Sequence, residues 1–342
     1  MNIKELARLA GVSTATISNV INDKTRSVSE ETRQRVLEII KETGYVPNGI
    51  AKSLRKQCSN TIGIITEDIA HFHVGEIVSE INRYAKQENY IVILHDLCQR
   101  NGKPDRVAVN SAINLFLKEK VEGIIYLAWQ DRDVDGLIDP INIPLVYAYC
   151  LSDSDSDERS WVNYDNVGSM LDIMNRVYEL NHRKIALLKG GDKECYPSNV
   201  RFQVYLDKLK EWGISYRDEY VKTGHWLFED GRRFYNELMA LQDPPTVVVS
   251  LNDEMAAGFI SESMNTDRKI LDKVSIVGYN GFSYCRFLYP TLATVKIPLK
   301  EIGFEATKQL IDEIQKKGCG KRRVILPCVY QDGDSLREMV VD

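Results

Sequence analysis

A short run near the amino terminus carries the clearest chemistry of the chain. Residues 13–19 read Ser-Thr-Ala-Thr-Ile-Ser-Asn, so hydroxyl and amide side chains dominate a stretch that bears no charge. Such groups form hydrogen bonds to phosphate oxygens and to the edges of bases. At helical spacing Ile17 falls on the side opposite most of them. The candidate nucleic-acid contacts in this run are Ser13, Thr14, Ala15, Thr16, Ser18 and Asn19.

The segment that must position these residues, 4–23, has the pattern of a helix-turn-helix motif. Gly11 stands between two helical patterns, where the turn requires a left-handed or closely approached backbone. Ser13 or Thr14 can cap the second helix with a hydroxyl oxygen. The apolar positions that can face each other across the turn are Leu6, Ala7, Ala10, Val12, Ile17 and Val20.

A third amphipathic helix is predicted directly after this motif. Residues 29–32, Ser-Glu-Glu-Thr, have a capping-box pattern, and Gly44 ends the helical periodicity. Its apolar residues are Val36, Leu37, Ile39 and Ile40. The sequence therefore predicts a small three-helix head with its own core.

A fourth, short helix is expected at about residues 47–56, between the head and the rest of the chain. Pro47 disfavours helix before it, and Asn48 can cap a new helix. One face is apolar (Ile50, Ala51, Leu54), and the remaining positions include Lys52, Arg55 and Lys56. Such a short helix is marginal in water, and Gly49 costs roughly 1 kcal/mol relative to Ala. We expect it to fold on DNA; a charged interdomain linker is the alternative.

The charge of the chain is distributed unevenly. Residues 1–60 contain ten Lys or Arg and six Asp or Glu, whereas the whole chain has a net charge of −5. The head is therefore basic and the remaining residues are acidic. A basic head can neutralise phosphates while the acidic body stays away from them, so overall acidity does not exclude DNA binding.

From residue 60 onward the sequence alternates between β-rich and amphipathic segments. Strands are expected at 61–66, 90–95, 123–128 and 144–149, with helices at 74–89 and 105–120 and a short amphipathic segment at 133–139. After the polar stretch 152–160 the alternation resumes with helices at 166–181, 197–213, 229–241 and 253–264, and strands at 184–190, near 220, at 246–252 and at 274–280. Two doubly wound α/β lobes are the predicted fold of this body.

Several classes of protein are not supported by the sequence. No stretch is as long and apolar as a membrane span, and we expect a cytoplasmic protein. Seven scattered cysteines form no Cys-x-x-Cys pair, so we expect reduced, mostly buried thiols and no metal site. Gly-x-Ser-x-Gly, Walker and His-Glu-x-x-His motifs are absent, so we expect neither an enzyme nor a bound cofactor. Gly190-Gly191 is only a weak phosphate-loop signal; a sugar-processing enzyme remains a remote alternative.

Head, linker and body together resemble the LacI/GalR family of transcription regulators over essentially the whole chain. The runs that carry the resemblance are VSTATISNVIN, SEETRQRVLEIIKETGYVPN and IAKSLR. The resemblance implies a homodimer on an approximately palindromic operator, with paired hinge helices in the minor groove and Leu54 as the wedge between base steps. The implied hinge contacts are Asn48, Ala51, Lys52, Leu54 and Arg55.

The resemblance also implies a body of periplasmic-binding-protein type. We expect a head with hinge helix at 1–58 and an effector-binding and dimerisation domain at 59–342. Its first lobe covers about 60–161 and 293–326, and its second lobe about 162–292 and 327–342. Ligands of such sheets bind at the carboxyl ends of the strands, which here face the cleft between the lobes.

One departure from the family concerns the helix that reads DNA. The usual Arg after the Ser of that helix is Asn19 here. Arg suits guanine and Asn suits adenine, so we expect an A·T pair in each half-site where relatives have G·C, with Ala15 giving only apolar contact. The alternative is that Asn19 contacts phosphate only.

Effector-binding residues follow from the same resemblance. Arg201 matches an effector-binding Arg and Asn252 an Asn that bonds ligand hydroxyls, and Asn280 stands where sugar-responsive relatives carry Asp. Phe72, His73 and Trp129 are candidate stacking walls. For each of these residues a purely structural role is the alternative; Asp253 is assigned to capping a helix.

The function expected from the sequence is that of a transcriptional regulator, most simply a repressor. Its operator affinity would be controlled by a small molecule between the lobes, a carbohydrate or derivative in the first instance. A nucleobase or a phosphoprotein partner is the alternative co-effector. The sign of the response, inducer or corepressor, stays open.

Overall fold

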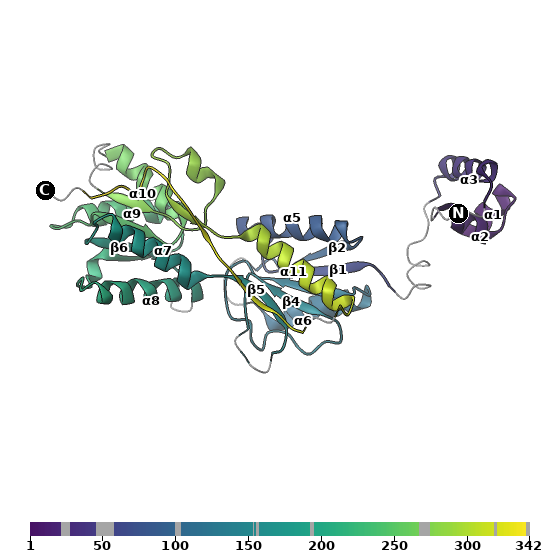
Figure 1. The fold of residues 1–342 in the computed structure, drawn as a ribbon, viewed down its shortest axis with the longest axis horizontal. Helices are drawn as coiled ribbons and strands as arrows, with labels where there is room; N and C mark the ends of the chain where they lie inside the picture. Colours follow the sequence, from purple (N-terminus) through teal and green to yellow (C-terminus); the bar gives the residue numbers. More distant parts are fainter. Residues whose placement is uncertain are drawn as a thin grey trace. The chain divides into compact units, whose positions relative to one another are not determined.

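The computed structural model describes residues 1–21, 28–45, 58–99, 104–152, 154, 157–191, 195–266, 274–317 and 320–339. The chain divides into two compact units, Met1–Ser59 and Asn60–Asp342 (Figure 1). The hinge helix expected at 47–56, with its candidate DNA contacts, lies outside the described residues.

The head consists of three helices, as predicted. They are α1 (Ile3–Ala10), α2 (Thr14–Ile21) and α3 (Glu30–Thr43). Gly11 and Gly44 follow α1 and α3 with φ of 62° and 60°, the left-handed conformation that ends a helix at little cost for glycine. The Ser29 hydroxyl accepts from Thr32 N at 3.3 Å and so caps α3. The buried core is formed by Leu6, Ala7, Ala10, Ile17, Val20 and Val36.

The first lobe of the body is built on a parallel sheet in the order β11-β5-β4-β3-β1-β2. Its strands are β1 (Thr61–Thr66), β2 (Ile91–Asp96), β3 (Gly123–Leu127), β4 (Leu145–Ala148), β5 (Ser160–Tyr164) and β11 (Arg323–Leu326). The helices of this lobe are α5 (Phe72–Gln87), α6 (Arg106–Lys118) and α11 (Leu299–Ile314), and α11 packs against α5. The buried strands β1, β3, β4 and β5 form the centre of this sheet, as expected where helices cover a parallel sheet.

The second lobe has a parallel sheet in the order β7-β6-β8-β9. Its strands are β6 (Ile185–Gly190), β7 (Val221–Gly224), β8 (Val247–Ser250) and β9 (Ser275–Val277). Its helices are α7 (Asn166–Glu179), α8 (Tyr196–Glu211), α9 (Phe228–Met239) and α10 (Asp253–Thr266), with short 3-10 turns η2 (Asp218–Tyr220) and η4 (Ser283–Phe287). Two doubly wound lobes are thus confirmed.

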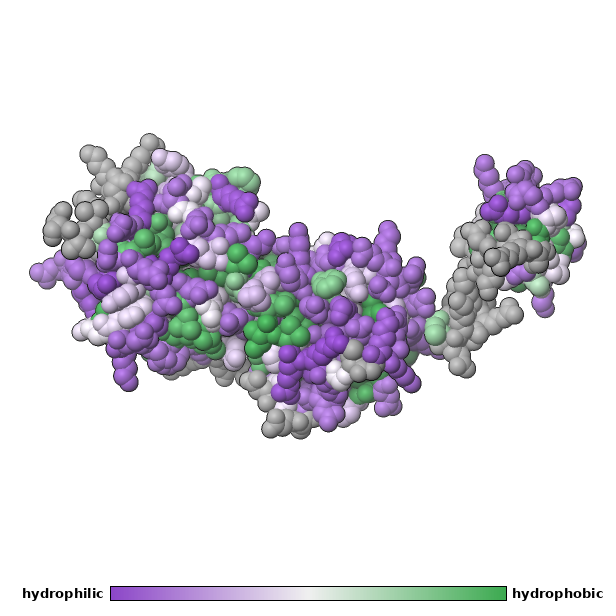
Figure 2. All heavy atoms as spheres, viewed as in Figure 1, coloured by the Kyte–Doolittle hydropathy of each residue, from purple (hydrophilic) through white to green (hydrophobic). Residues whose placement is uncertain are grey.

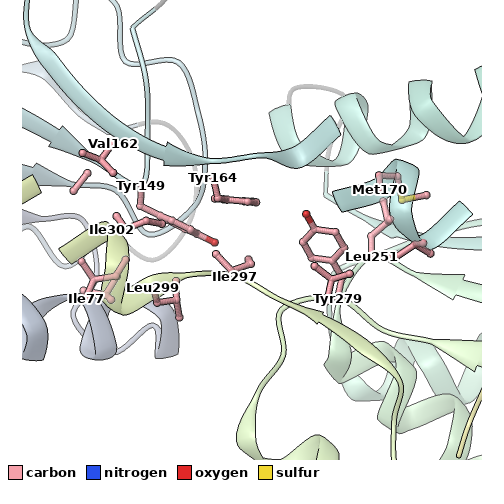
Figure 3. Packing of buried hydrophobic residues seen from close by; sticks show 14 of the residues in the cluster. Ile77, Tyr149, Val162, Tyr164, Met170, Leu251, Tyr279, Ile297, Leu299 and Ile302 are labelled. Atoms are coloured by element: carbon pink, nitrogen blue, oxygen red, sulfur yellow. The ribbon is translucent and has the colours of Figure 1, made fainter. Parts of the chain in front are cut away.

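The two lobes are joined by strands that cross between them. β10 (Thr294–Lys296) and β12 (Val329–Gln331) form a separate antiparallel pair, while β5 runs directly into α7. A single buried hydrophobic cluster extends from Ile77 and Leu299 on the first-lobe side to Met170 and Leu251 on the second. Figure 3 shows this cluster, with aromatic rings in its middle. The crossing region is therefore a packed core.

Two features of the body differ from the sequence interpretation. β5 was not predicted, because the preceding polar stretch obscured its short pattern Ser-Trp-Val-Asn-Tyr; all its residues are buried. The expected amphipathic segment at 133–139 is not an element but a turn with a bridge between Asp133 and Leu151. Gly136, at a φ of 67°, supports that turn.

The surface seen in Figure 2 is largely hydrophilic, with scattered hydrophobic areas. Within the described residues no helix has both the length and the apolar character needed to cross a bilayer.

Candidate functional site

The first candidate surface is the amino-terminal half of α2 in the head. Ser13 caps this helix, since its hydroxyl accepts from Thr16 N at 3.1 Å. The Ser13 and Thr16 hydroxyls also lie 3.0 Å apart. Thr14 and Ala15 are exposed, while Ile17 is buried against the head core. The helix therefore presents its polar start to solvent on a fixed backbone.

Asn19 and Ser18 are half-buried and lie on the same helix. The Asn19 amide forms no hydrogen bond within the described residues, so both its donor and its acceptor are available to a base edge. This geometry permits a contact of Asn19 to a base edge or to a phosphate.

The second candidate site lies at the carboxyl ends of the strands, between the lobes of the body. Phe72 and His73 begin α5, just after β1, and Trp129 follows β3. His71 lies between two of these rings, with centroids 4.9 Å from His73 and 5.2 Å from Trp129. The His71 ring thus contacts all three aromatic side chains that the sequence predicts to stack against an effector, Phe72, His73 and Trp129.

Phe282, from the second lobe, contacts the same group. Its ring stacks on His73 with a centroid distance of 5.1 Å and meets Phe72 edge-on at 4.6 Å. His73 is buried, and burial lowers the pKa of its imidazole well below the ordinary value; burial also lowers the pKa of His71 to about 4. Both rings are consequently neutral at physiological pH and act as hydrogen-bonding groups, not as cations.

Arg201 is buried in α8 and is held entirely by neutral groups. Its Nε donates to Asn166 Oδ1 at 2.9 Å, Nη1 to the Leu251 carbonyl at 3.1 Å and Nη2 to the Tyr164 hydroxyl at 2.7 Å. The guanidinium also lies 3.5 Å from the centre of the Tyr279 ring. Within the described residues three of its five N–H donors are used, which leaves two for a ligand.

The cap of α10 is Asn252 and not Asp253. Asn252 caps α10, because its Oδ1 accepts from Met255 N at 2.9 Å, and its Nδ2 donates to the Trp226 carbonyl. The Asp253 carboxylate instead accepts from the backbone of Gly281 and Phe282 at 2.7 and 3.0 Å. The assignment of Asp253 to capping was therefore wrong: a carboxylate one residue into the helix reaches the loop after β9.

Asn280 lies in that loop, at the crossing between lobes. Its backbone has a φ of 121° and pairs with Val295 and Ile297 on the crossing strand. The side chain is largely buried and forms no hydrogen bond within the described part of the chain. An amide in this position can both donate to and accept from a ligand.

Several buried polar atoms around this site lack any hydrogen-bond partner among the described residues. They are Thr66 Oγ1, His71 Nδ1, His73 Nε2, Trp129 Nε1 and Ser198 Oγ. Thr66, the two histidines and Trp129 lie at the carboxyl ends of β1 and β3, and Ser198 lies in the first turn of α8. Since buried polar groups are normally satisfied, this concentration indicates a place for a polar ligand.

Two buried carboxylates support the same region. Asp131 accepts from Asn163 and Asn166, so it is linked through the Asn166 amide to Arg201. Glu67 accepts from the Tyr126 hydroxyl at 2.6 Å and lies 3.4 Å from Arg132; burial nevertheless raises its pKa. Both acids are occupied by protein groups and hold the loop that carries Trp129.

Sequence reasoning missed several residues of this cluster. They are Tyr149, Tyr164, Trp226, Tyr279 and Phe282. Each of these residues ends a strand or follows one. An aromatic residue at the carboxyl end of a predicted strand could therefore have indicated a site residue. Tyr164 could not be recognised because β5 was not predicted.

Cavities in the body are small or lie away from this cluster. A cavity of about 110 Å³ adjoins it, lined by Asp131, Asn163 and Asn166. The largest one described, of about 480 Å³, lies at the opposite, amino-terminal ends of β4 and β5, beside Leu145 and Arg159. The Phe282 ring packs on His73 and Phe72, so a ligand between these rings would have to separate them.

Comparison with known proteins agrees with this architecture. Residues 2–48 match the model of the bacterial regulatory proteins of the lacI family, and residues 174–336 match the periplasmic binding protein-like domain. The chain is 29% identical over 327 residues to the HTH-type transcriptional repressor CytR of Escherichia coli K12, covering 95% of this chain and 93% of the relative. It is also 29% identical over 329 residues to the repressor PurR of Mannheimia succiniciproducens, covering 94% of each.

Solved structures show the same fold. The lac repressor dimer bound to operator and the anti-inducer ONPF aligns with a TM-score of 0.82 at 23% identity, over 98% of both chains. A complex of the transcriptional regulator CelR with cellobiose aligns with a TM-score of 0.66 at 24% identity, over 98% of this chain and 99% of that one. The sequence relatives are named as transcriptional repressors and not as enzymes, which confirms the non-enzymatic interpretation. The chain combines the DNA-binding domain of the bacterial regulatory proteins of the lacI family with a periplasmic binding protein-like domain, and it is a DNA-binding regulator of transcription.

Proposed function

We propose that the protein is a repressor whose operator affinity is set by a small polar effector bound between its two lobes. The observation that carries this proposal is a set of buried polar atoms at the strand ends that have no hydrogen-bond partner among the described residues, including His73 Nε2 and Trp129 Nε1. An effector that bonds to these atoms supplies hydrogen bonds that no described residue gives them. Phe72, His73, Trp129, Arg201 and Asn280 are its proposed contacts. Asn252 acts by capping α10 beside the site.

A carbohydrate or carbohydrate derivative is the first candidate for the effector. Sugar rings combine an apolar face with many hydroxyls, which suits aromatic walls next to amide and guanidinium groups. A nucleobase or nucleoside is the second candidate, since the parallel stack of His73 and Phe282 offers flat surfaces for a heterocycle.

DNA binding is assigned to the head, on the exposed polar start of α2. A homodimer would place two copies of α2 in successive major grooves of an approximately palindromic operator. The proposed hinge contacts are Asn48, Ala51, Lys52, Leu54 and Arg55, which lie outside the described residues. Action on the chromosome places the protein in the cytoplasm.

Dimerisation is supported by an exposed aromatic pair in the second lobe. The side chains of Phe287 and Tyr289 are 83% and 82% exposed, and aromatic residues are enriched at protein interfaces. We expect Phe287→Glu to shift sedimentation toward the monomer and to weaken operator binding. A sedimentation profile equal to that of the unmodified protein would remove this surface from the interface.

Ligand and operator must influence each other reciprocally. An effector that weakens operator binding ~100-fold must itself bind ~100-fold more weakly to the DNA complex, about 2.7 kcal/mol.

In the hinge, Gly49→Ala lowers the cost of forming a helix, so we expect tighter operator binding and a smaller effector response.

Two measurements test the proposal. Selection from randomised DNA should return inverted repeats for the intact chain and none for a variant that lacks residues 1–58. A thermal-shift panel of sugars, sugar phosphates and purines should identify a compound that changes operator affinity. Recovery of no inverted repeat with any compound present would refute the repressor function.

A further inference from the structure

Phe282 is a second-lobe residue whose ring packs on the first lobe. It follows β9, in the loop that leads to η4. Its ring is nearly parallel to that of His73, with an interplanar angle of 17° and centroids 5.1 Å apart, and it meets the Phe72 ring edge-on at 4.6 Å. Phe72 and His73 begin α5 of the first lobe. A movement that separates the lobes at this point must therefore break both ring contacts.

The backbone of Phe282 is held by a buried carboxylate. Asp253, in the first turn of α10, is fully buried, and its Oδ2 accepts from Gly281 N at 2.7 Å and from Phe282 N at 3.0 Å. Its Oδ1 accepts from the Thr294 hydroxyl on β10. Hydrogen bonds to a carboxylate are roughly twice as strong as those between neutral groups. One side chain thus ties the Phe282 loop both to α10 and to a strand that crosses between the lobes.

The crossing strand also contacts this loop directly. Asn280 N donates to the Val295 carbonyl at 2.9 Å, and Ile297 N donates to the Asn280 carbonyl at 3.2 Å. Figure 3 shows Ile297 where the strand passes from one lobe to the other. Gly281 has a φ of 74°, and a Cβ at this position would lie 2.4 Å from Lys296 Cα, so the loop lies tightly against the strand. The position of Phe282 is therefore coupled to that of the crossing strand.

Phe282 covers ring faces that the proposed effector would use. Phe72 and His73 are both proposed effector contacts, and the Phe282 ring already lies on them. Aromatic rings pack with centroids about 4.5–7 Å apart, so a ligand ring between His73 and Phe282 would need about twice their present separation. The loop is tied to α10 and β10, so room can be made only by a shift of the lobes or by rotation of the Phe282 side chain. A ligand ring and Phe282 therefore cannot stack on the same face of His73 at once.

We propose that Phe282 is a latch between the two lobes, that Asp253 positions it, and that an effector with a flat or apolar ring face displaces it from His73. The inference rests on the proposed function, because it concerns the same site. The contact of Phe282 with His73 and Phe72 stabilises one arrangement of the lobes, and an effector in its place removes that stabilisation. The effector thus acts on operator affinity through loss of the latch contact.

The latch can be observed in the full-length protein without any ligand. Protein made with 4-fluorophenylalanine gives a fluorine signal for each of its nine phenylalanines, and the Phe282 signal is identified by its loss in Phe282→Leu. We expect this signal to shift in Phe72→Leu, a change at a side chain that is 53% exposed, and in His73→Leu, because each removes a neighbouring ring. Phe202→Leu is the control, since the Phe202 ring stacks on Tyr205 within α8.

An unshifted Phe282 signal would overturn the latch. If His73→Leu does not fold, Phe72→Leu decides alone, because its exposed side chain contributes little to the core. A Phe282 signal that moves equally in Phe202→Leu would also count against the interlobe contact.

Two substitutions test Asp253 as a positioning residue. Asp253→Ala removes all three hydrogen bonds to the loop and β10, so we expect the Phe282 signal to shift. Asp253→Asn can keep an oxygen toward Gly281 and Phe282 and turn its NH₂ group toward the Thr294 hydroxyl, so it should restore the original signal. A signal unaffected by Asp253→Ala would remove Asp253 from the latch. If that variant does not fold, Thr294→Val, which removes one of the three bonds, takes its place.

Operator affinity tests whether the latch regulates DNA binding. With the operator recovered by DNA selection, Phe282→Ala should change the affinity at least fivefold without any added compound, and in the direction in which the effector acts. Phe202→Ala should leave the affinity unchanged. Equal affinity of Phe282→Ala and the unmodified protein would overturn the regulatory role of the latch.

Ligand displacement is measured by calorimetry with adenine and D-glucose as ring probes and D-glucitol as an open-chain probe. We expect a ring probe that binds to bind at least fivefold more tightly to Phe282→Ala, and to shift the Phe282 signal of the unmodified protein. D-glucitol, which has no ring face, should leave that signal in place. Equal or weaker binding to Phe282→Ala would overturn displacement and make Phe282 a wall of the site. Absence of binding by every probe would count against the proposed function, while the fluorine spectra still decide the latch.

Discussion

The head places its functional residues differently from the interlobe cluster, which comprises Phe72, His73, Trp129, Arg201 and Phe282. In the head, Thr14 and Ala15 are exposed on a helix whose buried side alone holds it in place. Between the lobes, His73 and Arg201 are buried and are tied to neighbours by rings and hydrogen bonds. The head therefore separates recognition from stability, whereas the cluster uses the same side chains for both.

This contrast arises because the head binds DNA, whereas the interlobe cluster is proposed to bind a small molecule. DNA is a large polyanion that can be read from the outside, so contact residues need only a rigid backbone beneath them. A small molecule must be enclosed to gain enough contact, so its contact residues become part of the core. Substitutions on the exposed surface of the head should therefore change DNA binding without changing stability. Substitutions in the interlobe cluster should change both effector binding and the stability of the body.

The largest effect is expected at Arg201. Arg201→Met removes a buried cation and leaves Asn166, Leu251 and Tyr164 without their donor, so we expect a loss of about 3–5 kcal/mol in the free energy of unfolding of the body, together with loss of the effector response. Urea unfolding followed by circular dichroism measures the first. Arg176→Met is the control, because that guanidinium is partly exposed and lies over the Tyr330 ring; it should cost under about 1 kcal/mol. Equal losses in both variants would show that the buried hydrogen bonds of Arg201 do not stabilise the body.

The next effect concerns the head core. Leu6→Ala truncates a fully buried side chain in the head core, which has six buried residues in the described part of the head, and we expect a loss of about 3 kcal/mol in the free energy of unfolding. Because so small a domain has a low free energy of unfolding, operator binding should fall at least 100-fold. The thermal transition of the body should be unchanged. Leu9→Ala, on the exposed side of the same helix, should leave operator binding intact. A shift of the body's transition in Leu6→Ala would show that the two units are not independent.

A pH effect of intermediate size is expected from Asp253. Burial raises its pKa to about 6 from the ordinary 3.8, and three hydrogen bonds only partly offset this. Between these values the native state holds a proton that the unfolded state has lost, so stability falls as pH rises through this window and is constant above it. Relative to Asp253→Asn, the unmodified protein should lose about 2 kcal/mol between pH 4.5 and 7. The free energy of unfolding of each protein is measured at both pH values, with Asp139→Asn, a surface change, as control. No difference in pH dependence between the proteins would mean that Asp253 has an ordinary pKa.

The smallest change in binding free energy is expected at Asn19, where the substitution should change base preference alone. Asn19→Arg should change the preferred base from adenine to guanine at one position of each half-site, worth about 1–3 kcal/mol, without a change in stability. Selection from randomised operators measures the preference. Identical preferred bases for the two proteins would assign Asn19 to phosphate contact. Thr14→Ser provides a control that keeps the hydroxyl on the same helix.

Prediction from the sequence was most successful where structure is local. The three head helices, their glycine stops and the cap at Ser13 all follow from spacing within a few residues, because helix caps and turns depend on neighbours in sequence. The alternation of strands and helices in the body was also recognisable, and with it the two-lobed fold. The exceptions were β5, whose short pattern follows a polar stretch, and the turn at 133–139.

The roles of the site residues depended on contacts between distant segments. From sequence Arg201 and Asn252 were both possible ligand contacts, but only the fold shows that Asn252 caps α10 and that Arg201 on α8 reaches Tyr164 on β5. The pairing of Phe282 with His73 joins residues more than two hundred positions apart. No periodicity within either segment indicates such a meeting.

The amino-acid sequence by itself determined the architecture and the class of the protein, because hydrophobic period, capping and turn residues act over a few neighbouring positions. The tertiary structure alone decided which buried polar atoms have no hydrogen-bond partner among the described residues and which side chains meet between the lobes. Those properties depend on burial and on the geometry of side chains from separate strands, which only the packed fold creates.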